Sequence, residues 1–293
     1  MRRLLSAAPS SMEVFDRGMR RLARVRGIDS RTVDGPAAGL DRVHFYDGAG
    51  EGPLPTLVLQ HGLGAANASQ FVPLLVAARK AYRRVVAIDL PGHGWSDPAP
   101  SMTSPGLFEA VEHVLDHHVD GPLVLVGNSL GGAMMLEYAL RRPERVHRLV
   151  LTSPAGAPYD DVQHAELKTI FAMPDRAAAR DFFQRMHARS PAWTPLVADD
   201  IRARFAQPHI RSLVGSFTPG EQFDATRLRD HRVPTLLVWG TADRLLPRSM
   251  LTWWRQHLPA RFEEPAGVGH APHLDEPVWH HRLVRDFAAA ASP

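Results

Sequence analysis

Cysteine is absent from the 293-residue chain, which excludes disulfide bonds, thiolate metal sites and a cysteine nucleophile. Lysine is almost absent too, because Lys80 and Lys168 are the only two and the remaining basic residues are arginines. The formal net charge is only +3, and no zinc-finger, RNP or helix-turn-helix pattern occurs. We therefore expect no nucleic-acid partner.

Long hydrophobic runs are missing as well. No apolar segment approaches the ~20 residues that span a bilayer. Arg2 and Arg3 are followed by no continuous apolar region of the kind that a secretory signal needs. We therefore expect a cytoplasmic protein. With 44% hydrophobic residues, the chain can bury the core of one large α/β domain.

The segment 1–29 contains a basic amphipathic helix. Arginines fill much of one side between residues 17 and 26, and the other side carries an apolar stripe, formed by Met12, Phe15, Met19, Leu22 and Val25. We expect this stripe to pack on the main domain. Peripheral membrane contact through residues 12–26 is the alternative.

Short apolar segments alternate with helical patterns along most of the chain. Strands are predicted at 30–33, 42–46, 56–59, 85–88, 123–126, 149–152, 234–239 and 261–264, the first two antiparallel. Residues 157–230 interrupt the alternation with helical periodicity and several prolines. The pattern predicts a mostly parallel, doubly wound sheet formed by residues 30–156 and 231–293, with a helical insertion at 157–230 after the sixth strand.

One strand-to-helix turn carries the pattern G-x-S-x-G, at Gly127-Asn128-Ser129-Leu130-Gly131. Between a buried strand and a helix, this pattern is typical of a nucleophile elbow, which holds a serine on a sharp turn with its hydroxyl exposed. A side chain at 127, 131 or 132 is expected to clash where the strand and helix backbones approach.

A serine nucleophile needs a base, and the base needs a third group that fixes its tautomer. Ser129, Asp243 and His270 each follow a predicted strand, in the order Ser, acid, His. His273 is the alternative base, and Asp160 and Asp161 are alternative acids. The main-chain amides of Leu63 and Leu130 are predicted to bind the oxyanion.

Five segments together resemble the α/β-hydrolase fold family over residues 30–290: His61-Gly62-Leu63-Gly64, Asp89–Ser96, Gly127–Gly132, Gly240–Asp243 and Gly269-His270. The resemblance implies the triad Ser129, Asp243 and His270, a cap over the active site, and no cofactor or metal. It suggests Asn128 and His61 as residues near the substrate, His61 chiefly by ordering the oxyanion loop. Family members that open epoxides or remove halide carry Asp at the elbow, so neither activity is expected.

Three hypotheses of function follow. The first is a serine hydrolase that cleaves carboxylic esters of fairly apolar small molecules. The second is a carbon–carbon bond hydrolase of aromatic meta-cleavage products; it is favoured by Asn128, although such enzymes commonly carry Trp where Ala271 follows the histidine. The third is a non-catalytic ligand-binding module on the same fold.

Overall fold

The computed structural model describes residues 9–36, 39–64, 67–219 and 223–291. Its centre is one eight-stranded sheet in the order β1-β2-β4-β3-β5-β6-β7-β8. The strands are β1 (Ile28–Val33), β2 (Val43–Ala49), β3 (Thr56–Gln60), β4 (Arg84–Ile88), β5 (Leu123–Asn128), β6 (Val146–Thr152), β7 (Thr235–Val238) and β8 (Arg261–Glu263). β1 pairs antiparallel with β2 and β2 with β4, whereas every other pairing is parallel. The predicted fold class is confirmed.

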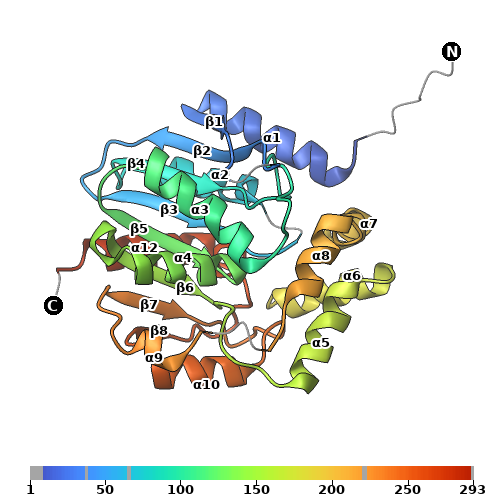
Figure 1. Cartoon of the computed structure of the whole chain (residues 1–293). Coiled ribbons are helices and arrows are strands. Elements are labelled where there is room, and N and C mark those ends of the chain that lie inside the picture. Colours follow the sequence, from blue (N-terminus) through green and yellow to red (C-terminus); the bar gives the residue numbers. More distant parts are fainter. Residues whose placement is uncertain (1–8, 37–38, 65–66, 220–222, 292–293) are drawn as a thin grey trace, which may run out of the picture.

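Two helical layers cover the sheet (Figure 1). One face carries α3 (Ser104–His118), α4 (Leu130–Arg141) and α10 (Arg248–His257). The other carries α1 (Ser11–Val25), α2 (Val72–Ala78), which follows the short 3₁₀ helix η1 (Ala68–Phe71), and α12 (Pro277–Ala289). Short helices η2 (Pro143–Arg145) and α11 (Pro272–Asp275) complete this part.

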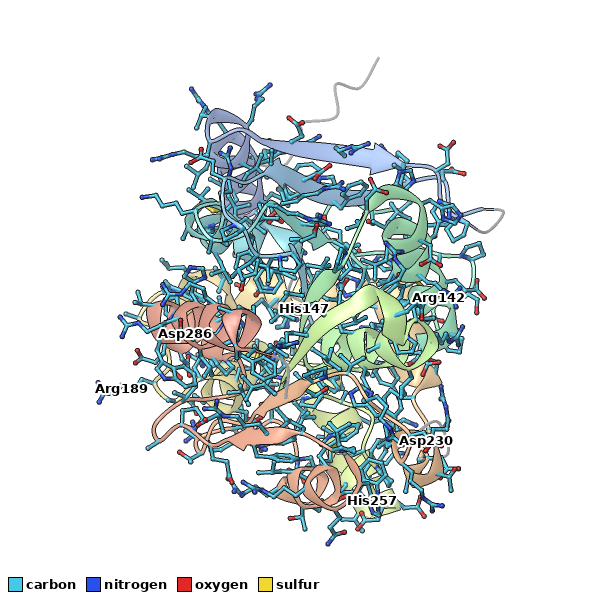
Figure 2. The ribbon with its side chains drawn as sticks, turned by 90° about the vertical axis from the view of Figure 1, so that its left-hand side faces the viewer. Arg142, His147, Arg189, Asp230, His257 and Asp286 are labelled. Carbon is cyan, nitrogen blue, oxygen red and sulfur yellow. The ribbon has the colours of Figure 1, made fainter. Side chains whose placement is uncertain are left out.

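The central strands are apolar because both of their faces are buried. In β5, Leu123 and Leu125 face the α3/α4 layer, while Val124 and Val126 face the α2/α12 layer. This alternation follows from the two-residue period of a strand. Charged side chains such as Arg189, Asp230 and Asp286 lie on the outside of the molecule (Figure 2).

The insertion between β6 and β7 is helical in its described residues. Four helices lie beside the edge of the sheet where the parallel strands end (Figure 1): α5 (Asp161–Ala172), α6 (Arg176–Met186), α7 (Thr194–Phe205) and α8 (Pro208–Ser216). We call α5–α8 the cap helices. They share an apolar cluster that includes Met173, Phe182 and Phe183. The short helix α9 (Ala225–Leu228) follows, and Leu228 packs in the cluster on the sheet.

Helix α1 packs on the domain through part of the predicted stripe, because Met19 and Leu22 pack against the cluster on the sheet and Met12 against the cap cluster. Asp16 and Ala23 are its buried residues, whereas Phe15 and Val25 are 47% and 67% exposed. The buried face is therefore rotated relative to the apolar stripe expected from the sequence. No described helix is long and apolar enough to cross a membrane.

Candidate active site

Ser129 lies on a strained turn between β5 and α4. Its backbone has φ 55° and ψ −122°, a conformation that is costly for a residue other than glycine. The turn is held because the Ser129 amide donates to the Thr152 carbonyl at 3.0 Å, and the Ser129 carbonyl accepts from the amide of Ala155 at 3.0 Å. Strain maintained in this way is typical of functional positions.

The glycines of the turn allow strand, helix and neighbouring loop to approach closely. A Cβ atom at Gly127 would lie 2.3 Å from the carbonyl oxygen of Gly131. One at Gly131 would lie 2.4 Å from the carbonyl oxygen of His61, and one at Gly132 would lie 2.9 Å from Pro154 Cβ. The predicted clashes are therefore confirmed, and the close approach places the loop after β3 against Ser129.

The structure brings His270 and Asp243 together. His270 Nδ1 lies 2.9 Å from Asp243 Oδ2, and both side chains are buried. Asp243 Oδ1 accepts from the amides of Leu245 at 2.9 Å and Leu246 at 3.3 Å. Burial alone would raise the pKa of Asp243, but the attraction and hydrogen bond of His270, with the Leu245 amide, leave it below its usual value. An ionised Asp243 favours the tautomer of His270 whose proton is on Nδ1.

The other ring nitrogen of His270 is free to act. His270 Nε2 is buried and has no hydrogen-bond partner within the described part of the chain. The main chain of His270 is fixed from two sides, because its amide donates to the Met186 carbonyl at 2.7 Å and its carbonyl accepts from Asn128 Nδ2 at 2.9 Å. The residue before Ser129 thus contacts the main chain of His270.

Neither the alternative acids nor the alternative base is placed to act in the triad. Asp160 is the exposed N-cap of α5, where it accepts from the amide of Gln163 at 2.8 Å, and Asp161 begins that helix. His273 Nε2 lies 3.2 Å from Gln70 Oε1, and the His273 ring packs beside Phe71. Burial, with neighbouring histidines, holds the pKa of His273 well below its usual value, so its ring stays neutral.

Leu63 and Leu130 both line the cavity that contains Ser129. Leu130 is the first residue of α4, so its amide has no partner inside the helix. The loop that carries Leu63 is fixed by two imidazoles. His93 Nε2 accepts from the Gly64 amide at 2.9 Å, and His61 Nδ1 donates to the Gly62 carbonyl at 2.7 Å.

His61 and Asn128 contact the protein and not the cavity. His61 is fully buried, and its Nε2 accepts from the Leu90 amide at 3.0 Å, so both of its nitrogens are used. Asn128 Nδ2 donates to the carbonyls of Thr152, at 3.0 Å, and His270. Neither residue lines the cavity. The contacts of His61 agree with its expected ordering of the loop that carries Leu63, and those of Asn128 connect β5 to the loop that carries His270.

Two further positioning residues, His187 and Asp275, were not predicted. Asp275 Oδ2 accepts from the amide of Gly269 at 2.7 Å, next to His270, and Asp275 Oδ1 lies 2.6 Å from His187 Nδ1. This pair ties the histidine loop to the segment after α6. The sequence holds no local signal for it, because the two residues are 88 positions apart.

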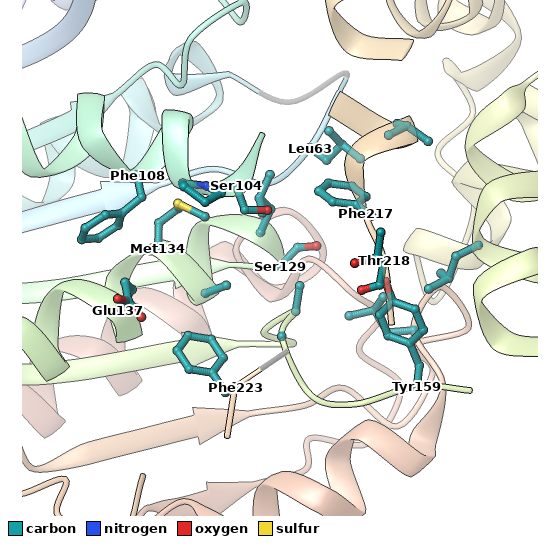
Figure 3. Close-up of a pocket in the computed structure, with 18 of the residues that line it drawn as sticks. Leu63, Ser104, Phe108, Ser129, Met134, Glu137, Tyr159, Phe217, Thr218 and Phe223 are labelled. Carbon is teal, nitrogen blue, oxygen red and sulfur yellow. The ribbon is translucent and has the colours of Figure 1, made fainter. Parts of the chain in front are cut away.

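The cavity has a volume of about 500 Å³ and lies between the sheet and the cap helices. Ser129 lies in its middle (Figure 3). Its walls are mostly apolar and include Met134, Phe171, Phe217 and Phe223. Phe171 therefore faces the cavity, while Met173, Phe182 and Phe183 form the cap's own core.

Metal binding is not indicated by the described ranges, where no three His, Asp or Glu side chains are grouped to hold an ion. His113 and His117, four residues apart on α3, have ring centroids 4.6 Å apart, and His117 Nδ1 lies 3.0 Å from the His113 carbonyl.

The sequence profile of the α/β hydrolase fold matches residues 55–277, and the chain belongs to this family. It is a hydrolase of α/β-hydrolase type, a class whose substrates are small molecules. A 2-hydroxymuconate semialdehyde hydrolase from Pseudomonas putida is 32% identical, over 87% of this chain and 93% of that protein. A pimeloyl-[acyl-carrier protein] methyl ester esterase from Aromatoleum aromaticum (strain DSM 19018 / LMG 30748 / EbN1) is 33% identical, over 76% of this chain and 94% of that protein.

Two more comparisons show how much of each protein the similarity covers. The dihydrolipoyllysine-residue acetyltransferase component of the acetoin cleaving system from Pseudomonas putida is 32% identical, over 71% of this chain, which spans only 56% of that protein. Among solved structures, a membrane phospholipase A described as a bacterial virulence factor superposes with a TM-score of 0.79, covering 96% of this chain and 92% of that one. At 24% identity this last likeness shows the shared fold.

Proposed function

We propose that this chain hydrolyses carboxylic esters of fairly apolar small molecules through an acyl-enzyme. The observation that carries the proposal is the buried, unpartnered Nε2 of His270, whose other nitrogen is bonded to Asp243. A general base needs such a carboxylate partner and a nitrogen left open for the serine proton, and His270 Nε2 has no hydrogen bond in the described residues, from Ser129 Oγ or any other group. The mostly apolar cavity around Ser129 supports the substrate class.

In the proposed mechanism, Ser129 Oγ attacks the ester carbonyl and its proton moves to His270 Nε2. Asp243 holds the ring and stabilises the imidazolium. The amides of Leu63 and Leu130 donate to the oxyanion of the tetrahedral intermediate. His270 then returns the proton to the leaving alcohol. In the second half, His270 takes a proton from water, which attacks the acyl carbon. The bond from that carbon to Ser129 Oγ then breaks, His270 returns the proton to Ser129 Oγ, and the acid leaves.

The test is hydrolysis of p-nitrophenyl butyrate by wild type and by Ser129→Ala. We expect kcat to fall by about 10⁴- to 10⁶-fold, because the variant lacks the nucleophile. A fluorophosphonate probe should label Ser129 in the wild type, as read by mass spectrometry. Equal hydrolysis by both proteins, or no label on Ser129, would refute the assignment. An unlabelled, inactive wild type would favour a non-catalytic module.

Carbon–carbon bond hydrolysis is the second candidate, and the relative named as a 2-hydroxymuconate semialdehyde hydrolase favours it. Two features weigh against it: Ala271 in place of Trp, and the engagement of the Asn128 amide with main-chain carbonyls. Mixing the enzyme with a coloured dienoate meta-cleavage product decides the matter. Loss of its visible absorbance faster than ester cleavage would establish this activity instead.

We also infer peripheral contact with anionic membranes through the outer face of α1. Val14 is 56% exposed, Phe15 and Val25 are also exposed, and Arg17 and Arg21 lie among them on the helix. Basic and apolar side chains on one face suit an anionic lipid surface. Co-sedimentation with phosphatidylglycerol vesicles should be lost in Arg17→Glu/Arg21→Glu. Absence of wild-type binding, or binding unaffected by this change, would eliminate the idea.

A further inference from the structure

The cavity extends from Ser129 in two directions. Figure 3 shows Phe108, Met134 and Glu137 on one side of Ser129, and Tyr159 and Thr218 on the other. We call the first direction the α4 arm, lined by Phe108, Ala133, Met134, Glu137, Arg141, Phe223 and Arg227, and the second the cap arm, lined by Tyr159, His164, Leu167, Phe171, Phe217 and Thr218. A two-armed cavity centred on the nucleophile can hold the two substituents of an ester in different places.

The α4 arm is straight because one helix forms its floor. Four of the cavity-lining residues of α4 follow Leu130 at spacings of three or four, on one face of the helix. At 1.5 Å per residue, Glu137 lies about 10 Å beyond Leu130 along the axis and Arg141 about 16 Å beyond it. Successive turns of α4 therefore line the arm at increasing distance from Ser129.

The first two turns of this arm are apolar. Ala133 and Met134 line the floor, and Phe108 of α3 forms a wall. Phe223 forms the opposite wall and is fixed in place. Its amide donates to the Gly156 carbonyl at 2.8 Å, and its ring occupies the space that a Cβ at Gly156 would need, at 2.6 Å. This part of the lining suits methylene groups, although Ser104 and Glu109 of α3 also line the cavity.

The arm ends at a group of ion pairs centred on Glu137. Glu137 accepts from Arg141 Nε at 2.8 Å and from Arg227 at 3.0 Å, and the Arg141 guanidinium lies 4.5 Å from the centre of the Phe108 ring. Burial would raise the pKa of Glu137, but hydrogen bonds and attraction from the two arginines outweigh it and keep the carboxyl ionised. Glu112 of α3 lies 3.6 Å from Arg141 Nη1, so two carboxylates face the two arginines at the end of the arm.

We propose that the α4 arm binds a linear, uncharged aliphatic chain of the substrate, on the order of eight carbons long. Glu137 excludes chains with an anionic end by occupying Arg227 and, together with Glu112, Arg141. The inference deepens the proposed ester hydrolysis and depends on it for the reaction. The length follows from the apolar distance between Ser129 and Glu137. Each methylene buried in the arm should raise kcat/KM about fourfold up to that length.

The first test varies chain length in two series: p-nitrophenyl esters with acyl chains of two to sixteen carbons, and acetate esters of alcohols of the same lengths. Wild type should prefer about eight carbons in one series, which identifies the side of the ester bond that enters the arm. Ala133→Leu narrows the arm one turn from Ser129 and should lower the eight-carbon to two-carbon ratio of kcat/KM at least tenfold in that series. Phe217→Trp, an enlargement in the cap arm, is the matched control and should change this ratio less than threefold.

The second test is a gain of function. Glu137→Gln removes the charge that occupies Arg227 and leaves Arg141 with Glu112 alone. If the acyl series shows the length preference, mono-p-nitrophenyl octanedioate should gain at least tenfold over p-nitrophenyl octanoate relative to wild type. If the alcohol series shows it, 8-acetoxyoctanoate should gain as much over octyl acetate. A gain cannot result from misfolding. An unchanged preference in Glu137→Gln, or equal ratio shifts in Ala133→Leu and Phe217→Trp, would overturn the proposal.

Binding without turnover separates this inference from the proposed function. In the Ser129→Ala background, calorimetry should show 1-octanol binding more tightly than 1-butanol, and Ala133→Leu should remove that difference. If no ester is cleaved but this pattern holds, the proposed reaction is wrong and the proposed binding of an aliphatic chain in the α4 arm is supported. If esters are cleaved and the pattern is absent, the proposed binding in the α4 arm is wrong.

Discussion

Asp243 is the residue whose charge orients His270, and its removal should affect the rate more than binding. Asp243→Asn keeps the side-chain shape but replaces the acceptor at 2.9 Å from His270 Nδ1, which favours the wrong imidazole tautomer. We expect kcat on p-nitrophenyl butyrate to fall by about 10⁴-fold with KM changed little. Steady-state kinetics measure both.

Asp160→Asn is the matched control for this substitution. Asp160 caps α5, and Asn is an equally good N-cap, so activity should stay within about threefold of wild type. A large loss in Asp160→Asn together with a small loss in Asp243→Asn would transfer the role of the acid to the cap segment.

The sequence could predict those residues that a local sequence pattern indicates. Ser129 is identified by glycines on either side and by the strand and helix around it, and His270 and Asp243 by their places after strands. His187 and Asp275 have no such pattern, because their contact joins the cap segment to the histidine loop. The hydrogen bonds of Asn128 could not be predicted either, since the direction of its amide depends on carbonyls 24 and 142 residues away.

At the scale of elements, α1 connects the oxyanion loop to the cap. Asp16 is buried and accepts from Asn67 Nδ2 at 3.0 Å and from Arg204 of α7 at 2.7 Å. Burial raises the pKa of Asp16, although Arg204 and Asn67 oppose this shift. The ring of Phe205, next to Arg204, occupies the space that a Cβ at Gly64 would need. The helix thus helps to hold α7 against the loop that carries Leu63.

Asp16→Ala should loosen this connection. Arg204 would lose its partner in a largely buried position, so we expect the free energy of unfolding to fall by about 1–3 kcal/mol. We also expect kcat to fall several-fold, because Asn67 no longer fixes the loop. Urea unfolding and ester kinetics measure the two effects. Arg17→Ala, on the exposed side of the same helix, should change neither.

A double-mutant cycle distinguishes a specific pair from general loss of packing. If Asp16 and Arg204 act together, Asp16→Ala/Arg204→Ala should destabilise by less than the sum of the single variants. Strict additivity would show that the ion pair does not join α1 to α7.

The orientation of α1 shows why hydrophobic periodicity did not predict which residues of this helix are buried. Hydrophobic periodicity places the helix but treats every Asp as exposed. Asp16 is buried because Asn67 and Arg204, 51 and 188 residues away, supply its hydrogen bonds. The helix therefore turns Asp16 inward and leaves Phe15 partly outside.

At the scale of the whole molecule, the alternation of strands and helices was enough to predict a parallel sheet with a helical insertion. The strand order was not predictable in the same way. β3 pairs with both β4 and β5, an arrangement set by crossover connections and not by any residue within β3. The contacts of Phe223 and Leu228 with the cluster on the sheet were not predictable either, because helical periodicity does not encode them.

Buried neutral histidines make the stability of the molecule depend on pH. Burial lowers the pKa of His93 to about 3 and of His231 and His280 to about 4. The unfolded chain binds a proton at each of these positions below a pH of about 6.5, whereas the folded protein does not. Stability should therefore be full above pH 6.5 and fall as the pH drops toward 4, by about 1.4 kcal/mol per pH unit for each histidine.

His280 allows this dependence to be tested at one position. It is 1% exposed on α12, and neither ring nitrogen has a hydrogen-bond partner in the described ranges. His280→Phe keeps a ring in the core and removes the titration, so the variant should gain about 2 kcal/mol over wild type at pH 5 relative to their difference at pH 8. Urea unfolding at pH 8, 6 and 5 measures the gain. Val284→Ala, one turn along the same helix, should destabilise the protein equally at all three values. A pH-independent effect of His280→Phe would mean that His280 binds its proton in the folded protein as readily as in the unfolded chain.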